Sequence, residues 1–293
     1  MKVQTKNDVI FQKLVITTII FMVGFLYSIA PFSQSKAASV EVAIEQAPIE
    51  LEDKEHLEQV LDAHNFDLDK IMEGNSAVPR VYFMNFPTDF KKVPNKREQF
   101  IQILLPIVLK ENEKISNDRE QILKLKAIED KGGKLSEEQM EWLNATAQAY
   151  RMDEWTFDSL LRRVDIIPVS LALGQASIET GYGCSYAAIK KNSPFGITLC
   201  SGVKRYDDLL DSVHQYMRNL NYNNAYEKMR LTREQMRQNG QQIDGHVLIG
   251  DLYHYSVQRG TYISKVRSAI KHNGLRKLDN VELCAAVPIS QNA

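Results

Sequence analysis

Apolar residues recur at intervals of three and four along most of the chain after residue 95. This spacing places them on one face of a helix, so it predicts a series of amphipathic helices. Pro106 predicts a kink in the first of them, and Ser136 opens a capping box with Gln139 ahead of another. Because no convincing set of alternating strands occurs, the body should be mainly α. Besides the capped helix after Ser136, the predicted helical segments are 96–114, which contains Pro106, 119–130, 157–164, 209–220 and 248–258.

Two segments before these helices have a different pattern. Residues 39–75 are acidic and weakly patterned, which predicts a flexible tether leading into a short helix. Residues 78–87 are apolar and aromatic and contain Pro79 and Pro87 near their ends. This composition predicts an extended segment that packs against the body.

The beginning of the chain has the order of an export signal. Basic residues up to Lys13 precede an almost uncharged apolar stretch, 14–32, and small residues follow up to Ala38. Cleavage after Ala37 or Ala38 is one expectation. The apolar stretch also approaches the roughly 20 residues that cross a bilayer, so an uncleaved membrane anchor is the alternative. Both alternatives predict an exported body.

Composition narrows the function classes. The chain has 293 residues, 44% of them hydrophobic, and a formal net charge of −1, which fits an ordinary globular body. The sequence has no net positive charge and no dense stripe of basic residues, so nucleic-acid binding is disfavoured. The 3 cysteines have no metal-ligand spacing. We expect either one disulfide with a thiol left over or three buried thiols.

One acidic residue stands out in an otherwise uncharged helical run. Residues 167–183 contain Glu179 as their only charged side chain, and Pro168 and Gly181 mark the expected helix ends. Glu179 then lies in the last turn, where apolar neighbours and the negative end of the helix dipole should both raise its pKa. A raised pKa suits a general acid. The alternative is a surface glutamate at a frayed helix end.

The motif around Glu179 resembles a known enzyme family. Residues Ala172–Ser185 read ALGQASIETGYGCS, and Asn192–Ile197 read NSPFGI at the expected distance. Together they closely resemble the bacterial N-acetylglucosaminidases of glycoside hydrolase family 73. Further stretches, among them Pro79–Tyr82 and Met217–Asn221, look like the bacterial Bax-type proteins. The resemblance extends from Val78 to about Leu278.

This resemblance implies a lysozyme-like, mostly α fold that acts on peptidoglycan glycan strands. It implies cleavage of the β-1,4 bond after N-acetylglucosamine, with Glu179 as general acid and Tyr216 as active-site tyrosine. No metal or cofactor is implied. The substrate-binding candidates are Gln175, Tyr182, Asn192, Phe195, Tyr206 and Tyr226.

The same resemblance sets the expected organisation and location. The protein should reach the periplasm or the outer face of the inner membrane of a Gram-negative bacterium, with a possible membrane tether through 14–32. The expected parts are an export segment at 1–38, the acidic tether at 39–75, a helical leader at 76–134, a glucosaminidase domain at 135–280 and a tail at 281–293.

The chain departs from the family pattern at one place. Members often carry a second carboxylate in a small β-lobe, but the residues between Gly196 and Tyr206 contain no acid, so the lobe should be reduced or missing. Asp207, Asp208 and Asp211 follow at a helix start, where capping explains them. Two readings remain. Either the substrate's 2-acetamido group assists the reaction, or the protein binds glycan with little turnover. A lytic transglycosylase is disfavoured because the Glu-Ser motif is absent.

Overall fold

The computed structural model of the protein describes residues 47–285, and all of these belong to one unit of the chain. The predicted export segment, the start of the tether and the end of the tail lie outside the described residues. Among the helices that are described, none has both the length and the apolar character needed to cross a membrane.

The residues that follow position 50 are folded, so the prediction of a flexible tether is wrong for them, whereas the helix that was expected to follow the tether is present. Helix α2 (Lys54–Ala63) and helix α3 (Leu68–Met72) each begin after an aspartate whose side chain caps the first turn. Leu57 and Leu61 lie four residues apart on α2 and are buried in the core. The acidic residues occupy the opposite, solvated face, and this explains why composition alone suggested a tether.

The extended segment is confirmed. Val78, Val81 and Phe83 are buried, and the segment forms two isolated parallel bridges, Ile49 with Phe83 and Val78 with Leu283. A short 3-10 helix, η1 (Phe90–Lys92), follows. The bridge to Leu283 also shows that the first residues of the predicted tail pack on the body.

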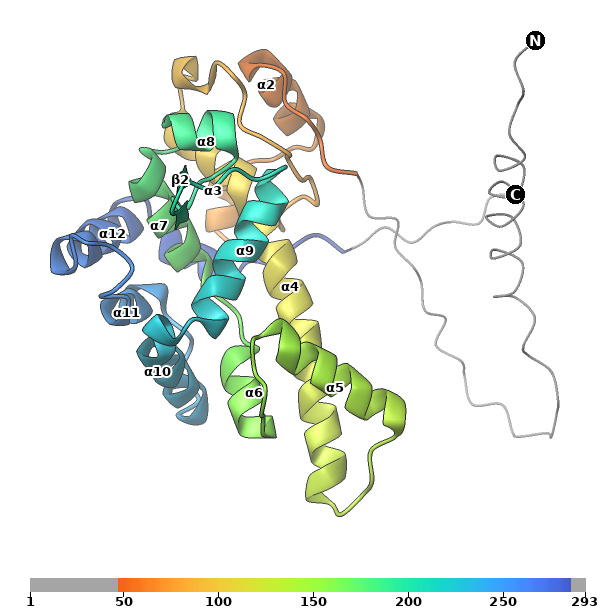
Figure 1. Cartoon of the computed structure of the whole chain (residues 1–293). Coiled ribbons are helices and arrows are strands. Elements are labelled where there is room, and N and C mark those ends of the chain that lie inside the picture. Colours follow the sequence, from red (N-terminus) through yellow and green to blue (C-terminus); the bar gives the residue numbers. More distant parts are fainter. Residues whose placement is uncertain (1–46, 286–293) are drawn as a thin grey trace, which may run out of the picture. The chain divides into compact units, whose positions relative to one another are not determined.

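The first predicted pair of helices is one continuous helix. Segments 96–114 and 119–130 form α4 (Lys96–Asp130), and the polar stretch between them remains helical. Asn112 fixes this middle part, because its side chain donates to the Ile167 carbonyl (2.8 Å) and accepts from the Ile167 amide (3.0 Å). Helix α5 (Glu137–Ala149), with the expected capping box at its start, and α6 (Phe157–Arg163) lie along the second half of α4 (Figure 1).

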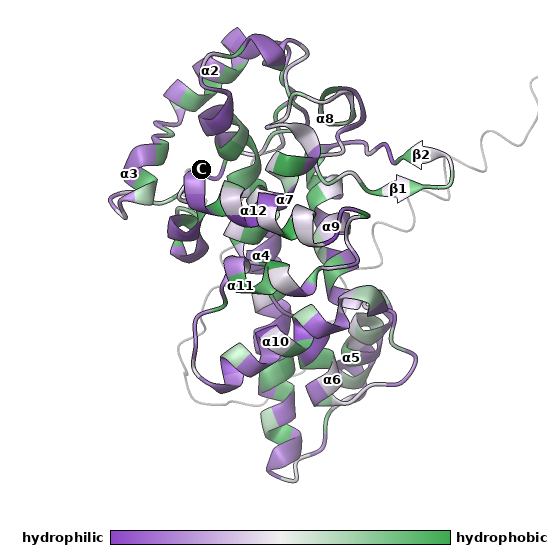
Figure 2. Cartoon of the chain, turned by 90° about the vertical axis from the view of Figure 1, so that its left-hand side faces the viewer, coloured by the Kyte–Doolittle hydropathy of each residue, from purple (hydrophilic) through white to green (hydrophobic). Residues whose placement is uncertain are grey.

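Helix α7 (Val169–Thr180) carries Glu179 and is buried along most of its length. Pro168 precedes it and Gly181 ends it in the left-handed conformation (φ 58°), as predicted. It packs against α4 on one side and α12 (Gly260–His272) on another. The contact with α12 is close, because a Cβ on Gly174 would lie 2.8 Å from Ile270 Cγ1. In Figure 2, α7 lies behind α12.

The remaining elements complete a mainly α fold with a reduced β-lobe, as predicted. Two strands, β1 (Thr198–Leu199) and β2 (Gly202–Val203), form a two-stranded antiparallel hairpin at the edge of the helical body (Figure 2). The other helices are α8 (Tyr186–Lys191), α9 (Leu209–Tyr222), η2 (Asn224–Tyr226), α10 (Glu227–Gln238), α11 (Gly245–Leu248), η3 (Ile249–Asp251) and η4 (Leu275–Asn280).

Two predictions are corrected in this second half. The predicted helix over 248–258 forms only at its start, where Leu248 ends α11 and Ile249–Asp251 form η3. The chain then leaves the helical conformation, and α12 begins at Gly260 after Arg259, whose φ is 49°. The cysteines are neither paired nor all buried. Cys184 is partly buried, Cys200 and Cys284 are exposed, and all three thiols are free.

Candidate active site

Glu179 occupies the last turn of α7, with its side chain partly buried. The loop after α8 approaches it closely at Gly196, whose φ is 63°. A Cβ added there would lie 2.9 Å from Glu179 Oε2. A side chain at this position would therefore displace either the loop or the carboxyl group. Glycine lets the NSPFG motif lie directly against the acid.

Burial controls the protonation of Glu179. Loss of water around the carboxyl group raises its pKa, and a hydrogen bond from the Tyr262 side chain opposes this in part, leaving the pKa raised. Within residues 47–285, no charged side chain contributes to this shift. A carboxyl group in such surroundings keeps its proton to higher pH than an exposed glutamate, which is the property that a general acid needs.

A chain of hydrogen bonds leads from the core to this carboxyl group. The Tyr216 hydroxyl donates to Gln175 Oε1 (2.8 Å), and Gln175 Nε2 donates to the Tyr262 hydroxyl (3.0 Å). Tyr262 in turn bonds to Glu179. Because the Tyr262 oxygen accepts from Gln175, its own hydrogen is free to point at Glu179. The chain therefore orients a donor toward the acid.

Tyr262 is the site residue that the sequence did not single out. It lies on α12, more than eighty positions after Glu179, and is 3% exposed. In the sequence it is one of several tyrosines in the second half, and for each of these a core position was the simpler explanation. Only the packing of α12 on α7 brings its hydroxyl to the acid.

The structure places Tyr216 and Gln175 differently from the prediction. Both side chains are fully buried, so neither faces a bound sugar in this conformation. Phe195 is buried as well and stacks on the Tyr216 ring, with 3.7 Å between the centroids and an interplanar angle of 6°. These three residues are linked to one another in the core. The substrate-binding role of Gln175 and Phe195 and the role of Tyr216 as active-site tyrosine stay predictions.

Two other predicted binding residues belong to the core, and two reach the surface. Tyr206 and Tyr226 are 6% and 7% exposed, too little to offer a stacking face. Asn192 is partly exposed, but its amide donates to the Asp207 carbonyl (3.0 Å) and so joins the end of α8 to the segment before α9. Tyr182 is the predicted residue that lines a pocket. Its hydroxyl accepts a hydrogen bond from Asn273 Nδ2 (2.9 Å).

Among the acids after the β-hairpin, Asp208 has the capping role that the sequence suggested. Asp208 is the N-cap of α9, and its side chain accepts from the Asp211 amide (2.8 Å). In the part of the chain that the structure describes, Tyr262 is the side chain that acts on the pKa of Glu179 besides burial, and no second acid acts on it.

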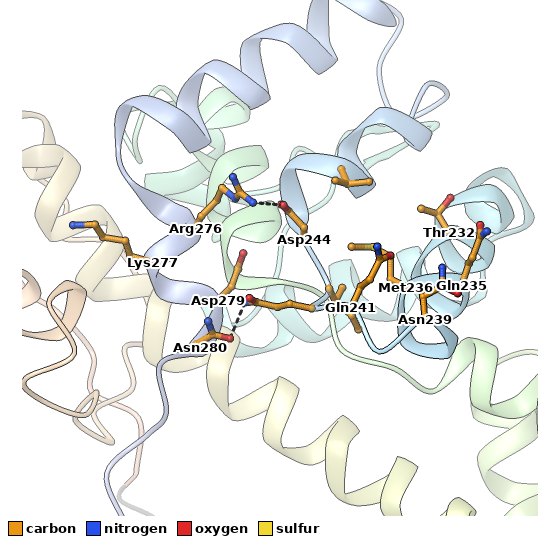
Figure 3. Close-up of a pocket in the computed structure, with 13 residues that line it drawn as sticks. Thr232, Gln235, Met236, Asn239, Gln241, Asp244, Arg276, Lys277, Asp279 and Asn280 are labelled. Carbon is orange, nitrogen blue, oxygen red and sulfur yellow. Dashed lines mark hydrogen bonds and ion pairs between the residues drawn. The ribbon is translucent and has the colours of Figure 1, made fainter.

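A larger cavity lies beside the other end of α7. Its volume is about 790 Å³, and helix α10, the loop that follows it and η4 supply its polar lining (Figure 3). Asp279 stands in its wall and accepts from both the amide and the hydroxyl of Ser170, at 2.7 Å each. Ser170 and Glu179 are about 13 Å apart along the helix axis, so this cavity is separate from the candidate acid.

Comparison with known proteins agrees with this geometry. Residues 155–275 match the family model glucosaminidase, described as mannosyl-glycoprotein endo-beta-N-acetylglucosaminidase. The chain is also similar to Protein bax of Escherichia coli (strain K12), with 28% identity over 195 residues that cover 59% of this chain and 69% of that protein. No solved structure gave a significant match. The chain therefore carries a domain of the glucosaminidase family, in a context similar to the Bax-type proteins.

Proposed function

We propose that the protein hydrolyses the glycan strand of peptidoglycan at the β-1,4 bond that follows N-acetylglucosamine, with Glu179 as the general acid. The observation that carries this proposal is the partly buried Glu179 carboxyl group, whose pKa is raised by burial within the matched family domain. The proposal includes export of the domain to the cell envelope, where this substrate lies.

In the proposed reaction, protonated Glu179 gives its proton to the glycosidic oxygen as the bond to the sugar C1 breaks. The Tyr262 hydroxyl then donates to the new carboxylate and stabilises its charge. Glu179 regains a proton from the water that completes the reaction. This cycle uses one protein carboxyl group, so the nucleophile must come from elsewhere.

We assign that nucleophilic role to the substrate. The oxygen of the 2-acetamido group attacks C1 as the leaving group departs, and water later opens the resulting ring, a recognised exception to the two-carboxylate scheme. The support for this assignment is the lack of any acid acting on Glu179 among residues 47–285. The same observation favours a second candidate function, a glycan-binding protein with little or no turnover.

The two functions separate in one experiment. Purified full-length protein is incubated with peptidoglycan, and new reducing ends are measured for wild type and for Glu179→Gln. We expect wild type to release them and the variant to be about 10²- to 10⁴-fold slower, the usual contribution of general acid catalysis.

The matched control is Glu98→Gln, because burial also raises the pKa of Glu98, which lies at the start of α4. This variant should keep wild-type activity. Equal rates for wild type and Glu179→Gln would refute the hydrolase. Binding to peptidoglycan without any product would support the second candidate, and anhydro-sugar products would indicate a transglycosylase instead.

A further inference from the structure

A small pocket next to Glu179 is lined by cationic side chains. Its volume is about 280 Å³, and its wall includes Ile178 in the last turn of α7 and Tyr182 in the turn that follows the helix. Arg97 reaches it from the start of α4, with its guanidinium carbon 5.2 Å from the centre of the Tyr182 ring. The rest of the lining comes from one face of α12, at Lys265, Ser268, Ala269 and His272.

The two charged residues of the pocket, Arg97 and Lys265, have no acid as a partner in the part of the chain that is described. Within residues 47–285, neither Arg97, Lys265 nor His272 forms an ion pair, although exposed cations elsewhere on the body do. Lys265 Nζ donates instead to the neutral Gln258 side chain (2.8 Å), and His272 Nδ1 lies 3.4 Å from the Ser268 hydroxyl. The pocket lining contains no aspartate or glutamate.

The positive charge is a local property of α12. That helix has the sequence GTYISKVRSAIKH, which holds basic residues and no acid, whereas the whole chain has a net charge of −1. A cluster of one sign on an otherwise balanced protein attracts ligands of the opposite sign to that place. The pocket therefore favours an anionic group.

The pocket borders the candidate acid along the chain, because Ile178 in its wall directly precedes Glu179 on α7. Tyr262, which bonds to Glu179, and Lys265 are three residues apart on α12 and so share one face of the helix. Lys265 lies about 4.5 Å beyond Tyr262 along the axis and His272 about 15 Å beyond it. A strand whose sugar lies at Glu179 can thus place a neighbouring substituent in the pocket.

We propose that this pocket is a subsite for a carboxylate of the substrate, borne on the peptide that branches from the sugar next to the cleaved bond. The inference rests on the proposed glycan hydrolase function and deepens it, because it makes the substrate an anionic, peptide-bearing strand. Arg97 and Lys265 supply the charge, and the Tyr182 ring packs against the aliphatic part of the substituent.

The test compares binding of two ligands that differ only in charge. The first is a tetrasaccharide of alternating N-acetylglucosamine and N-acetylmuramic acid that carries its peptides. The second is the same fragment with its carboxylates converted to amides. Calorimetry uses the full chain with Glu179→Gln, so that neither ligand is consumed. We expect the charged fragment to bind about tenfold more tightly, and high salt to remove the difference.

Variants assign this preference to the pocket. Arg97→Gln and Lys265→Gln should each weaken binding of the charged fragment about three- to tenfold and change binding of the amidated fragment less than twofold. The matched control is Lys271→Gln, which removes a charge from the same helix outside the pocket lining. It should leave both affinities within about twofold of the parent.

The outcomes separate this inference from the function on which it rests. Equal affinities for the two fragments, no binding of either, or equal losses in the Lys265→Gln and Lys271→Gln proteins would overturn the subsite, even if wild type releases reducing ends. Failure of wild type to release reducing ends, combined with tight and variant-sensitive binding of the charged fragment, would refute the hydrolase and keep the subsite.

Discussion

Glu179 and Asp165 are both shielded from water, but their pKa values are shifted in opposite directions. Asp165, in the link between α6 and α7, has a side chain only 3% exposed. Burial alone would raise its pKa, but the charge of Arg233, the hydrogen bond from Arg237 and the charge of Arg119 outweigh it and lower the pKa. At Glu179, burial raises the pKa and only the hydrogen bond from Tyr262 opposes it, so the pKa stays raised.

The comparison teaches that the neighbours decide what a buried acid does. Asp165 accepts from Arg237 Nε at 2.6 Å, and its cations come from α4 and α10, so its charge holds separate helices together. Such a carboxylate has no proton to give near neutral pH. Glu179 holds nothing together in this way, and its proton is available for chemistry.

Loss of the Asp165 charge should have the largest effect on stability. In Asp165→Asn the buried Arg233 and its neighbours keep their charges without the balancing carboxylate, so the free energy of unfolding should fall by about 3–5 kcal/mol in denaturant titrations. Glu120→Gln, which breaks an exposed pair with Lys124, should cost about 0–1 kcal/mol.

The folded fraction of the Asp165→Asn protein should retain wild-type turnover, because the residue lies outside the candidate site. A stability loss no larger than that of Glu120→Gln would show that Asp165 does not anchor the helices. A loss of turnover in the folded fraction would contradict the assignment of a purely structural role to Asp165.

A third acid, Asp279, lies between these extremes and should make stability depend on pH. Burial raises its pKa to about 6, although its hydrogen bonds with Ser170 lower it. Between pH 4 and 6 the native carboxyl group binds its proton more tightly than the unfolded one does. This preference therefore contributes stability below pH 4 that is lost as the pH rises through 6.

The size of the effect follows from the shift. Relative to Asp279→Asn, wild type should lose up to about 3 kcal/mol of unfolding free energy between pH 4 and pH 7. Denaturant titrations at a series of pH values measure this difference. Parallel stability curves for the two proteins would mean that the Ser170 hydrogen bonds cancel the effect of burial.

The smallest expected effect concerns the tyrosine at Glu179. Tyr262→Phe removes a hydrogen bond that lowers the pKa of Glu179, so the high-pH limb of the activity profile should move to higher pH. Turnover should fall about tenfold, because the new carboxylate loses its donor. Tyr216→Phe, which acts two hydrogen bonds further away, should leave the position of that limb unchanged. Identical profiles for Tyr262→Phe and wild type would remove Tyr262 from the site.

The sequence predicted the helix around Glu179 well because its signals are local. Pro168 and Gly181 are boundary residues, and the uncharged run between them requires burial. The capping box at Ser136 and the reduced β-lobe are similarly readable from adjacent residues. The helix predicted over 248–258 is present only up to Asp251, because its periodicity gave no sign of the turns that follow η3.

The site around the acid was only partly predictable. The motif identified Gln175, Phe195 and Tyr216 as neighbours of Glu179, but motif spacing does not tell which side of the acid a residue occupies. All three are buried in the core. Tyr262 and the basic residues of α12 could not be predicted as neighbours of Glu179, because their proximity to it depends on how α12 packs against α7 at Gly174. Such contacts are a property of tertiary packing, which no local pattern encodes.

The protonation of Glu179 is the central claim, and its direct test is a titration of the side-chain carboxyl carbons by ¹³C NMR in the full chain. The Glu179 signal is assigned by its loss in the Glu179→Gln protein. We predict a Glu179 midpoint above the ordinary value of 4.5, and in the same spectra an Asp165 midpoint below its ordinary 3.8. A Glu179 midpoint at or below 4.5 would contradict the account of this residue as a proton donor.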